Sequence, residues 1–246
     1  MADIHISPNL FHLAETAALH FIWLGNEAIS RTGRFMVALA GGSTPKTTYK
    51  LLSTPEFLPL INWYRVYIFW GDERCVPPNH PDSNYRMTKE ALLDNIPIPP
   101  GNIHRIKGEL EPKIAATDYE NQLKSAFGDH PQFDLVLLGM GEDGHTASLF
   151  PGTAAIHEKE RWVLGHFVEK LDSWRITLTP VILNQARNIN FLVSGESKAE
   201  TLKQVLHGKH DPDLLPSQVI DPAQGSVTWL VDKAVASSLD LPPNSP

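Results

Sequence analysis

Cysteine is almost missing from this chain, whose 246 residues include only Cys75. An intramolecular disulfide is therefore excluded, and a reducing compartment is expected, with the cytosol as the default. Long hydrophobic runs are missing as well, since no stretch approaches the roughly 18 apolar residues that a membrane-spanning helix needs. The first residues, Met1 to His5, lack the basic and apolar regions of a secretory signal. We therefore expect a cytoplasmic protein that does not enter membranes.

Clustered positive charge is the next feature that the sequence lacks. It has 21 Lys and Arg residues against 28 Asp and Glu residues, which gives a net charge of -7. Such a surface repels nucleic acids and anionic membranes, so neither is expected as a partner, and nothing indicates an obligate protein partner. An acidic protein that binds a phosphorylated metabolite must gather cations or backbone N–H groups in one pocket, and such a pocket is what we look for.

Short apolar runs do alternate with longer amphipathic ones along the chain. Apolar runs predict strands at 35–40, 66–70, 133–138, 162–168, 175–178, 189–193 and 227–231. Apolar spacing of three to four residues predicts helices at 8–31, 45–53, 83–93, 112–126 and 198–206. Strands that are apolar on both faces and precede helices are typical of a parallel sheet covered on both sides. We therefore predict a three-layer, doubly wound, mostly parallel, Rossmann-like α/β fold. Residues 1–240 are expected to form one catalytic domain, followed by a Pro-rich tail at 241–246.

Ligands bind at the carboxyl ends of the strands in such sheets, and the first predicted strand ends in a glycine-rich turn. The segment consists of Gly41, Gly42, Ser43, Thr44 and Pro45. Glycines let the backbone approach an anion, and a following helix offers free N–H groups. The turn is neither a Walker loop nor a Gly-x-Gly-x-x-Gly turn. Taken alone, it is equally compatible with an anion site and with an ordinary helix cap.

Two further strand ends carry charged side chains. Asp72 and Arg74 follow the strand at 66–70, and being two residues apart they are both expected to face a ligand. After the strand at 133–138, three glycines bracket Glu142 and Asp143, and His145 follows them. A histidine beside a carboxylate is suited to general base catalysis near neutral pH. No His-x-x-x-His or Cys-x-x-Cys pair supplies metal ligands, so no metal is expected.

Two cations lie near later strands. Arg175 begins an apolar segment, and Lys198 lies at a strand-to-helix turn. Each one alone is more typical of an exposed surface cation. Together with the glycine-rich turn, they would complete a phosphate site, because Arg binds phosphate in a bidentate manner and Lys binds it as a point charge.

These segments together resemble the 6-phosphogluconolactonases over roughly residues 8–235. The matching stretches are Gly41–Pro45, Trp70–Arg74 with Asp82–Tyr85, Gly139–Pro151 and Arg175–Thr177. The resemblance implies a cofactor-free and metal-free hydrolase of the pentose phosphate pathway that converts 6-phospho-D-glucono-1,5-lactone to 6-phosphogluconate. It also implies the fold of the sugar-phosphate isomerases and deaminases. A small phosphorylated sugar lactone is then the expected ligand.

The resemblance leads to a mechanism. His145 is expected to activate a water, with Asp143 or Glu142 orienting it and Asp72 holding the water or a sugar hydroxyl. Backbone N–H groups near Gly42, or Arg74, are candidates for the oxyanion. The resemblance places Arg74, Arg175 and Lys198 around the ligand, the last two nearer the phosphate.

Three alternatives stay open. A sugar-phosphate deaminase or isomerase of this fold carries a glutamate shortly after the histidine, and this chain lacks it there. A non-catalytic sugar-phosphate sensor would need a DNA-binding segment before residue 8, for which there is no room. A serine esterase based on Ser148 lacks the Gly-x-Ser-x-Gly elbow.

Overall fold

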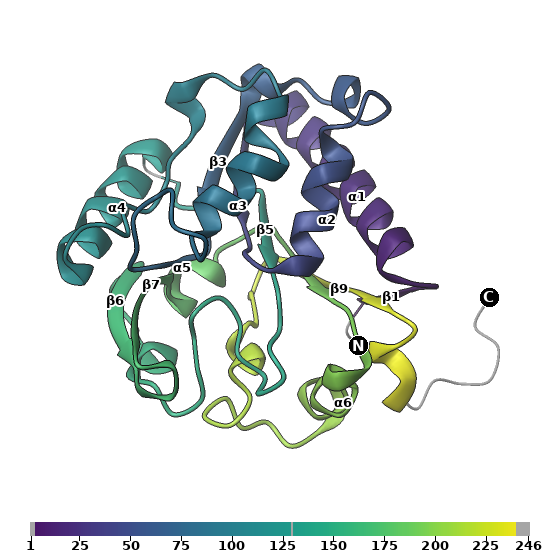
Figure 1. Ribbon diagram of the computed structural model, residues 1–246, viewed down its shortest axis with the longest axis vertical. Helices are drawn as coiled ribbons and strands as arrows, with labels where there is room; N and C mark the ends of the chain where they lie inside the picture. The colour runs from purple at the N-terminus through teal and green to yellow at the C-terminus, as the bar shows by residue number, and fades with distance from the viewer. Residues whose placement is uncertain (1–2, 129, 240–246) are drawn as a thin grey trace.

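The computed structural model describes residues 3–128 and 130–239, so the Pro-rich tail predicted at 241–246 lies outside the described residues (Figure 1). Its centre is a six-stranded sheet whose strands are all parallel. The strand order is β1 (Asp3–Ser7), β9 (Ser226–Asp232), β8 (Asn188–Val193), β5 (Leu135–Leu138), β2 (Phe35–Leu39) and β3 (Val66–Trp70). Five of the seven predicted strands belong to it. The edge strand β1 was not predicted, because its residues alternate between exposed and partly buried positions instead of forming a continuous apolar run.

Helices cover both faces of this sheet. In Figure 1, α1 (Leu10–Thr32) and α2 (Ser43–Leu52) lie on one side with α3 (Asn84–Ala91), whereas α4 (Pro112–Phe127) and α6 (Ala199–His207) lie on the other. A short helix, α5 (Pro180–Leu183), precedes β8. The predicted three-layer α/β fold is therefore confirmed. No helix within the described ranges has the length and apolar character needed to cross a bilayer.

A second, antiparallel sheet was not predicted. It contains β4 (Asp72–Arg74), β7 (Ser173–Leu178) and β6 (Val163–Val168), in that order. The runs at 162–168 and 175–178 are strands, as expected, and they pair with each other in this separate sheet. Only four residues connect β6 to β7, which suffices for a hairpin and not for a parallel crossover. The charged residues Asp72–Arg74, which follow β3, form the short strand β4.

Two buried tyrosines fix the chain where β2 and β3 leave the central sheet. The hydroxyl of Tyr49 donates to the carbonyl of Ala40 (2.8 Å) and accepts the Ala40 N–H (3.0 Å). Tyr119 makes the same pair of bonds with Trp70, at 2.9 and 2.7 Å. Burial raises the pKa of both phenols, so they stay neutral donors. The backbone is thus held on the sheet directly before the segments that the sequence singled out.

Candidate active site

Two adjoining cavities, of about 220 and about 470 Å³, lie at the carboxyl ends of the parallel strands. Asp72, Arg74, His145 and Ala147 line both of them. The two cavities bring together all ten residues that the sequence selected. The first is lined by Gly41, Gly42, Ser43, Thr44, Asp72, Arg74, His145 and Lys198, and the second by Asp72, Arg74, Asp143, His145 and Arg175.

The glycine-rich turn presents the start of α2 to the first cavity. Gly42 precedes the helix with φ 103°, a conformation that a side chain disfavours. The N–H groups of Ser43 and Thr44 lie in the first turn, where backbone donors have no intrahelical acceptor. The hydroxyl of Thr44 is paired with that of Ser194 (2.8 Å), whereas Ser43 is exposed. The turn therefore offers backbone donors, the positive end of a helix dipole and the Ser43 hydroxyl to an anion.

His145 is paired with one of the two carboxylates that the sequence left open, and that carboxylate is Asp143. Nδ1 of His145 lies 2.6 Å from Oδ1 of Asp143, and Oδ2 of Asp143 accepts from Nζ of Lys170 at 2.5 Å. The hydrogen bond with His145 is the main cause that lowers the pKa of Asp143 far below its usual range, and Lys170 adds to it against the effect of burial. An ionised Asp143 only accepts, so Nδ1 carries a proton, and in the neutral imidazole Nε2 is then the nitrogen with the free lone pair.

Packing fixes the orientation of the imidazole. The ring of His145 stacks on Phe150, with centroids 4.1 Å apart and planes 22° from parallel. A Cβ atom on Gly141 would overlap Nδ1 and Cε1 of the ring, so only glycine allows this approach. Phe150 occupies the region after the histidine where the deaminase pattern has a glutamate, and it gives the base an apolar neighbour there.

Asp72 is buried between the two sheets, with 8% of its surface exposed. Its Oδ2 accepts from the hydroxyl of Ser148 (2.6 Å), and its Oδ1 lies 3.2 Å from Nδ2 of Asn84. Asn84 in turn lies so close to Gly41 that a Cβ atom on residue 41 would overlap its amide. The carboxylate of Asp72 is therefore held by donors on both sides at the edge of the shared cavity wall.

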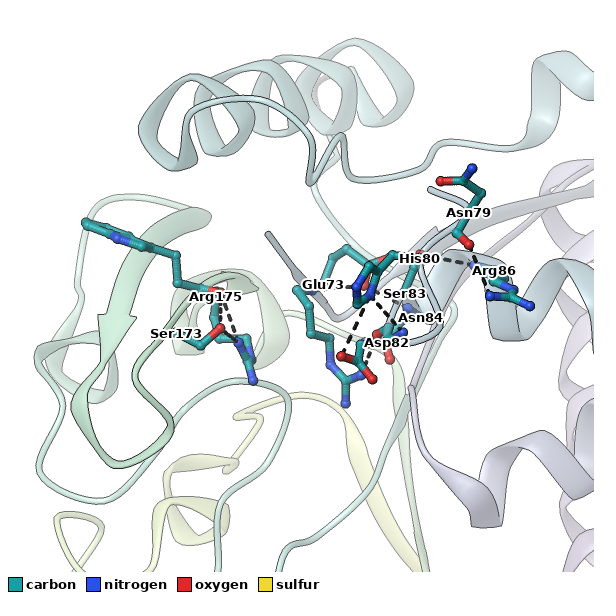
Figure 2. A network of polar contacts seen from close by, with 11 residues as sticks. Glu73, Asn79, His80, Asp82, Ser83, Asn84, Arg86, Ser173 and Arg175 are labelled. Atoms are coloured by element: carbon teal, nitrogen blue, oxygen red, sulfur yellow. Dashed lines mark hydrogen bonds and ion pairs between the residues drawn. The ribbon is translucent and has the colours of Figure 1, made fainter. Parts of the chain in front are cut away.

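Glu73 organises the start of α3, which carries Asn84. Its buried carboxylate accepts the N–H groups of Arg74 (2.8 Å), Asn84 (2.7 Å) and Tyr85 (2.8 Å), and the hydroxyl of Ser83 (3.0 Å). Figure 2 shows Glu73 next to Ser83 and Asn84, with Arg175 on the opposite side of the view. Burial raises the pKa of Glu73, and the three backbone N–H groups partly offset that rise. A buried carboxylate with four donors is a rigid support, and it places Asn84 beside Asp72.

Arg74 and Arg175 face each other across β4 and β7. Like charges in directly opposite positions repel, and here they stay half-buried. Arg74 donates to the carbonyl of Asp82 (2.5 Å), and Arg175 to the hydroxyl of Ser173 (2.5 Å), so the described ion pairs include no carboxylate partner for either. Burial and then the charge of Arg74 lower the pKa of Arg175. An anion bound between the two guanidinium groups would relieve this repulsion.

Lys198 is a second cation of the first cavity, besides Arg74. It lies directly before α6, half-buried, and burial lowers the pKa of its ammonium group against the opposite effect of Glu142 and Asp232. A desolvated ammonium gains most from a directly bound anion. Since Lys198 shares its cavity with the Gly41–Thr44 turn, an anion at this turn has both a cation and backbone donors within the lining.

Asn84, Phe150 and Lys170 also belong to the site, and they were not predicted from the sequence. Asn84 and Phe150 lie within the stretches that carry the family resemblance, and this position was the signal in the sequence that could have indicated them. Lys170 lies in the β6–β7 turn, and no sequence pattern marks it. Within residues 3–128 and 130–239, no three His, Cys, Asp or Glu side chains are grouped so as to hold a metal ion.

Comparison with known proteins decides the family. The family model described as glucosamine-6-phosphate isomerases/6-phosphogluconolactonase matches residues 8–229. The chain belongs to this family. It is 42% identical to a 6-phosphogluconolactonase from Nostoc sp. over 220 residues, which cover 87% of this chain and 88% of the relative. A relative of the same name from Synechocystis sp. is 42% identical over 219 residues, with the same coverage.

Solved structures of the glucosamine-6-phosphate isomerase/6-phosphogluconolactonase family agree with this fold. The 6-phosphogluconolactonase of Trypanosoma brucei superposes with a TM-score of 0.86 at 31% identity, covering 97% of this chain and 99% of that one. A monomeric glucosamine-6-phosphate deaminase also superposes, with a TM-score of 0.82 at 21% identity, and shows that the fold is shared. Within this family, the chemistry of the cavity lining and not the fold must distinguish one activity from another.

Proposed function

We propose that this chain is a 6-phosphogluconolactonase, which hydrolyses 6-phospho-D-glucono-1,5-lactone to 6-phospho-D-gluconate in the pentose phosphate pathway. The observation that carries the proposal is the pair of Asp143 and His145, because His145 also lines the cavity that holds the Gly41–Thr44 turn. Hydrolysis of a phosphorylated lactone needs a base for water and a cationic region for the phosphate, and both line this space. The names of the Nostoc and Synechocystis relatives support the same reaction.

The proposed reaction begins at Nε2 of His145, which takes a proton from a water. The oxygen of this water attacks the lactone carbonyl carbon, C1, and forms a tetrahedral intermediate with a negative charge on the former carbonyl oxygen. The intermediate collapses by breaking the bond between C1 and the ring oxygen, and the imidazolium returns its proton to that oxygen. Asp143 stabilises the imidazolium through Nδ1. Asp72 holds the water or a sugar hydroxyl.

Different cations and backbone donors are proposed for the two negatively charged groups, the oxyanion of the intermediate and the phosphate of the substrate. Arg74 lies beside Asp72 on the wall common to both cavities and is the proposed donor to the oxyanion. Lys198 and the Gly41–Thr44 turn are the proposed phosphate site. Arg175 is assigned to the phosphate as well, from the second cavity, so the substrate would extend across the wall that the cavities share.

A coupled assay tests this function. Glucose-6-phosphate dehydrogenase generates the lactone in place, and 6-phosphogluconate is measured with and without the protein, because the lactone also hydrolyses spontaneously. The parent protein is expected to accelerate the reaction, and His145→Ala is expected to lower kcat by at least about a hundredfold, the low end of what general base catalysis contributes. Thermal unfolding of the variant checks that its fold is kept.

Two outcomes would contradict the proposal. A parent protein that does not exceed spontaneous hydrolysis but releases ammonia from glucosamine 6-phosphate would be a deaminase. A His145→Ala variant with near-normal kcat would leave the lactonase activity in place and remove His145 from its mechanism.

A further inference from the structure

Ser148 connects the loop that carries His145 to all three strands of the second sheet. Its side chain is 1% exposed. Its hydroxyl donates to Oδ2 of Asp72 in β4 (2.6 Å), and its N–H donates to the hydroxyl of Thr177 in β7 (3.2 Å). Its carbonyl lies 2.9 Å from Nε2 of His166 in β6 and can only accept, so this nitrogen carries the proton. Each polar group of Ser148 therefore contacts a different strand.

The backbone beside Ser148 is held in a conformation that needs such support. Ala147 has φ 46°, which is uncommon for a residue with a side chain and persists only where the surroundings determine it. The residues before and after Ala147 are both held by hydrogen bonds. The hydroxyl of Thr146 donates to the carbonyl of Gly139 (2.8 Å), and Ser148 makes the bonds described above. Ala147 lines both cavities, so this loop conformation shapes the wall that they share.

We propose that Ser148 is a positioning residue, which fixes Asp72 relative to His145 for lactone hydrolysis. The inference rests on the proposed function. Asp72 lies in β4 and His145 lies in the loop after β5, and the bond from Ser148 is a direct link between the carboxylate and the loop of the base. Asn84 holds the other carboxylate oxygen, so Asp72 loses one of its two side-chain donors when the hydroxyl of Ser148 is removed. Because this hydroxyl is buried and donated to Asp72, Ser148 is not placed to act as a nucleophile.

Removal of the hydroxyl tests the proposal. Ser148→Ala is expected to lower kcat by about ten- to a hundredfold, the factor that corresponds to a lost hydrogen bond to a charged group, and to change KM by less than about threefold. Ser148→Thr keeps the hydroxyl and is expected to regain most of the lost kcat. If Ser148→Ala does not fold, Ser148→Cys, whose thiol is a weak donor of similar size, is measured instead, with the same loss expected.

Ser217→Ala is the matched control. Ser217 is 2% exposed, and its hydroxyl donates to the carbonyl of Gly144 in the same loop (2.8 Å). Its own N–H donates to that carbonyl as well (2.8 Å), so the loop keeps one bond in the variant. No described bond joins Ser217 to Asp72. This variant is expected to retain most of the parent's kcat, and an equal loss in both variants would overturn the proposal.

A double-mutant cycle distinguishes positioning of Asp72 from a general structural effect. In an Asp72→Asn background, Ser148→Ala is expected to change kcat by less than about twofold, because the residue through which Ser148 acts is already lost. Multiplied losses would overturn the inference. A near-normal kcat for Asp72→Asn alone would also overturn it, while the parent's lactonase activity would still support the proposed function. A parent without lactonase activity would instead refute the proposed function itself.

Discussion

The imidazole of His145 occupies the space in which a side chain on Gly141 would have to lie. The N–H of Gly141 also donates to the carbonyl of His145 at 2.9 Å, so the two residues are tied at the backbone as well. Gly141→Ala must therefore displace the ring. Since a displacement of about 1 Å can cost about a hundredfold in rate, we expect kcat to fall by up to that factor while the thermal unfolding temperature changes little.

Gly101→Ala is the control for this substitution. Gly101 lines neither cavity, has no positive φ, and apart from its chain neighbours has no heavy atom within 4 Å of the position of its Cβ. It is expected to retain most of the parent's kcat in the coupled lactonase assay. If Gly141→Ala retains it as well, the orientation of His145 is not a requirement for the reaction.

Asp143→Asn is expected to lower kcat by about a hundredfold or more, because Asn no longer provides a charge for the imidazolium and can stabilise the wrong tautomer. The substitution is also expected to change how the free energy of unfolding depends on pH.

The pKa of Asp143 lies below its ordinary value of 3.8, mainly because of the bond with His145. A carboxyl with a lowered pKa contributes stability above its unfolded pKa and loses it as the pH falls toward the folded one.

The free energy of unfolding of the parent and of Asp143→Asn, measured by urea denaturation, therefore has an expected pattern. The difference between them is larger near neutral pH and shrinks as the pH falls below about 4. A difference that grows in acid would mean that the carboxylate is not stabilised in the folded protein.

Lys198→Met and Arg175→Met separate phosphate binding from binding of the lactone group. A cation that binds the phosphate equally in the ground and transition states affects mainly KM. Each variant is expected to raise KM for the phosphorylated lactone by about tenfold or more, in line with the loss of a charge-assisted bond. Glucono-1,5-lactone lacks the phosphate, so its kcat/KM is expected to change little. Equal losses on both substrates for either residue would place that residue at the lactone group.

The sequence predicted which strand ends lie close together better than it predicted how the strands pair. The ends of β2, β3 and β5 were found because these strands are apolar on both faces and each ends at glycine, and parallel strands bring such ends to one edge. The pairing of β6 and β7 in a separate antiparallel sheet was not predicted, since an apolar run identifies a strand but not its partner. The short turn between them was the available signal.

The residues that the sequence did not assign depend on packing between distant segments. Lys170 reaches Asp143 from a turn 27 residues further along the chain, and nothing in its local sequence indicates that contact. The choice between Glu142 and Asp143 likewise needed coordinates, because both carboxylates are within three residues of His145. The roles of the ten selected residues stay predictions until the variants are measured.

Glu73→Gln is expected to lower the free energy of unfolding of the protein, because the carboxylate of Glu73 accepts from four donors at the start of α3. In the parent, Oε2 of Glu73 accepts the N–H of Tyr85 and the hydroxyl of Ser83. If the NH₂ group of the glutamine replaces this oxygen, it cannot accept from these two donors. Leaving buried donors unpaired costs about 1–3 kcal/mol, which corresponds to a fall of about 2–10 °C in Tm for a chain of this size.

Glu111→Gln is the matched comparison, since Glu111 caps the start of α4. It is exposed and accepts a single N–H, that of Ile114 at 3.0 Å. Loss of such a cap is expected to cost about 0.5–1 kcal/mol, because water can replace the acceptor. The Tm of both variants is measured by calorimetry, and Glu73→Gln is expected to have the lower value. An equal or higher Tm for Glu73→Gln would show that the donors around residue 73 find other partners. The start of α3 would then not depend on this carboxylate.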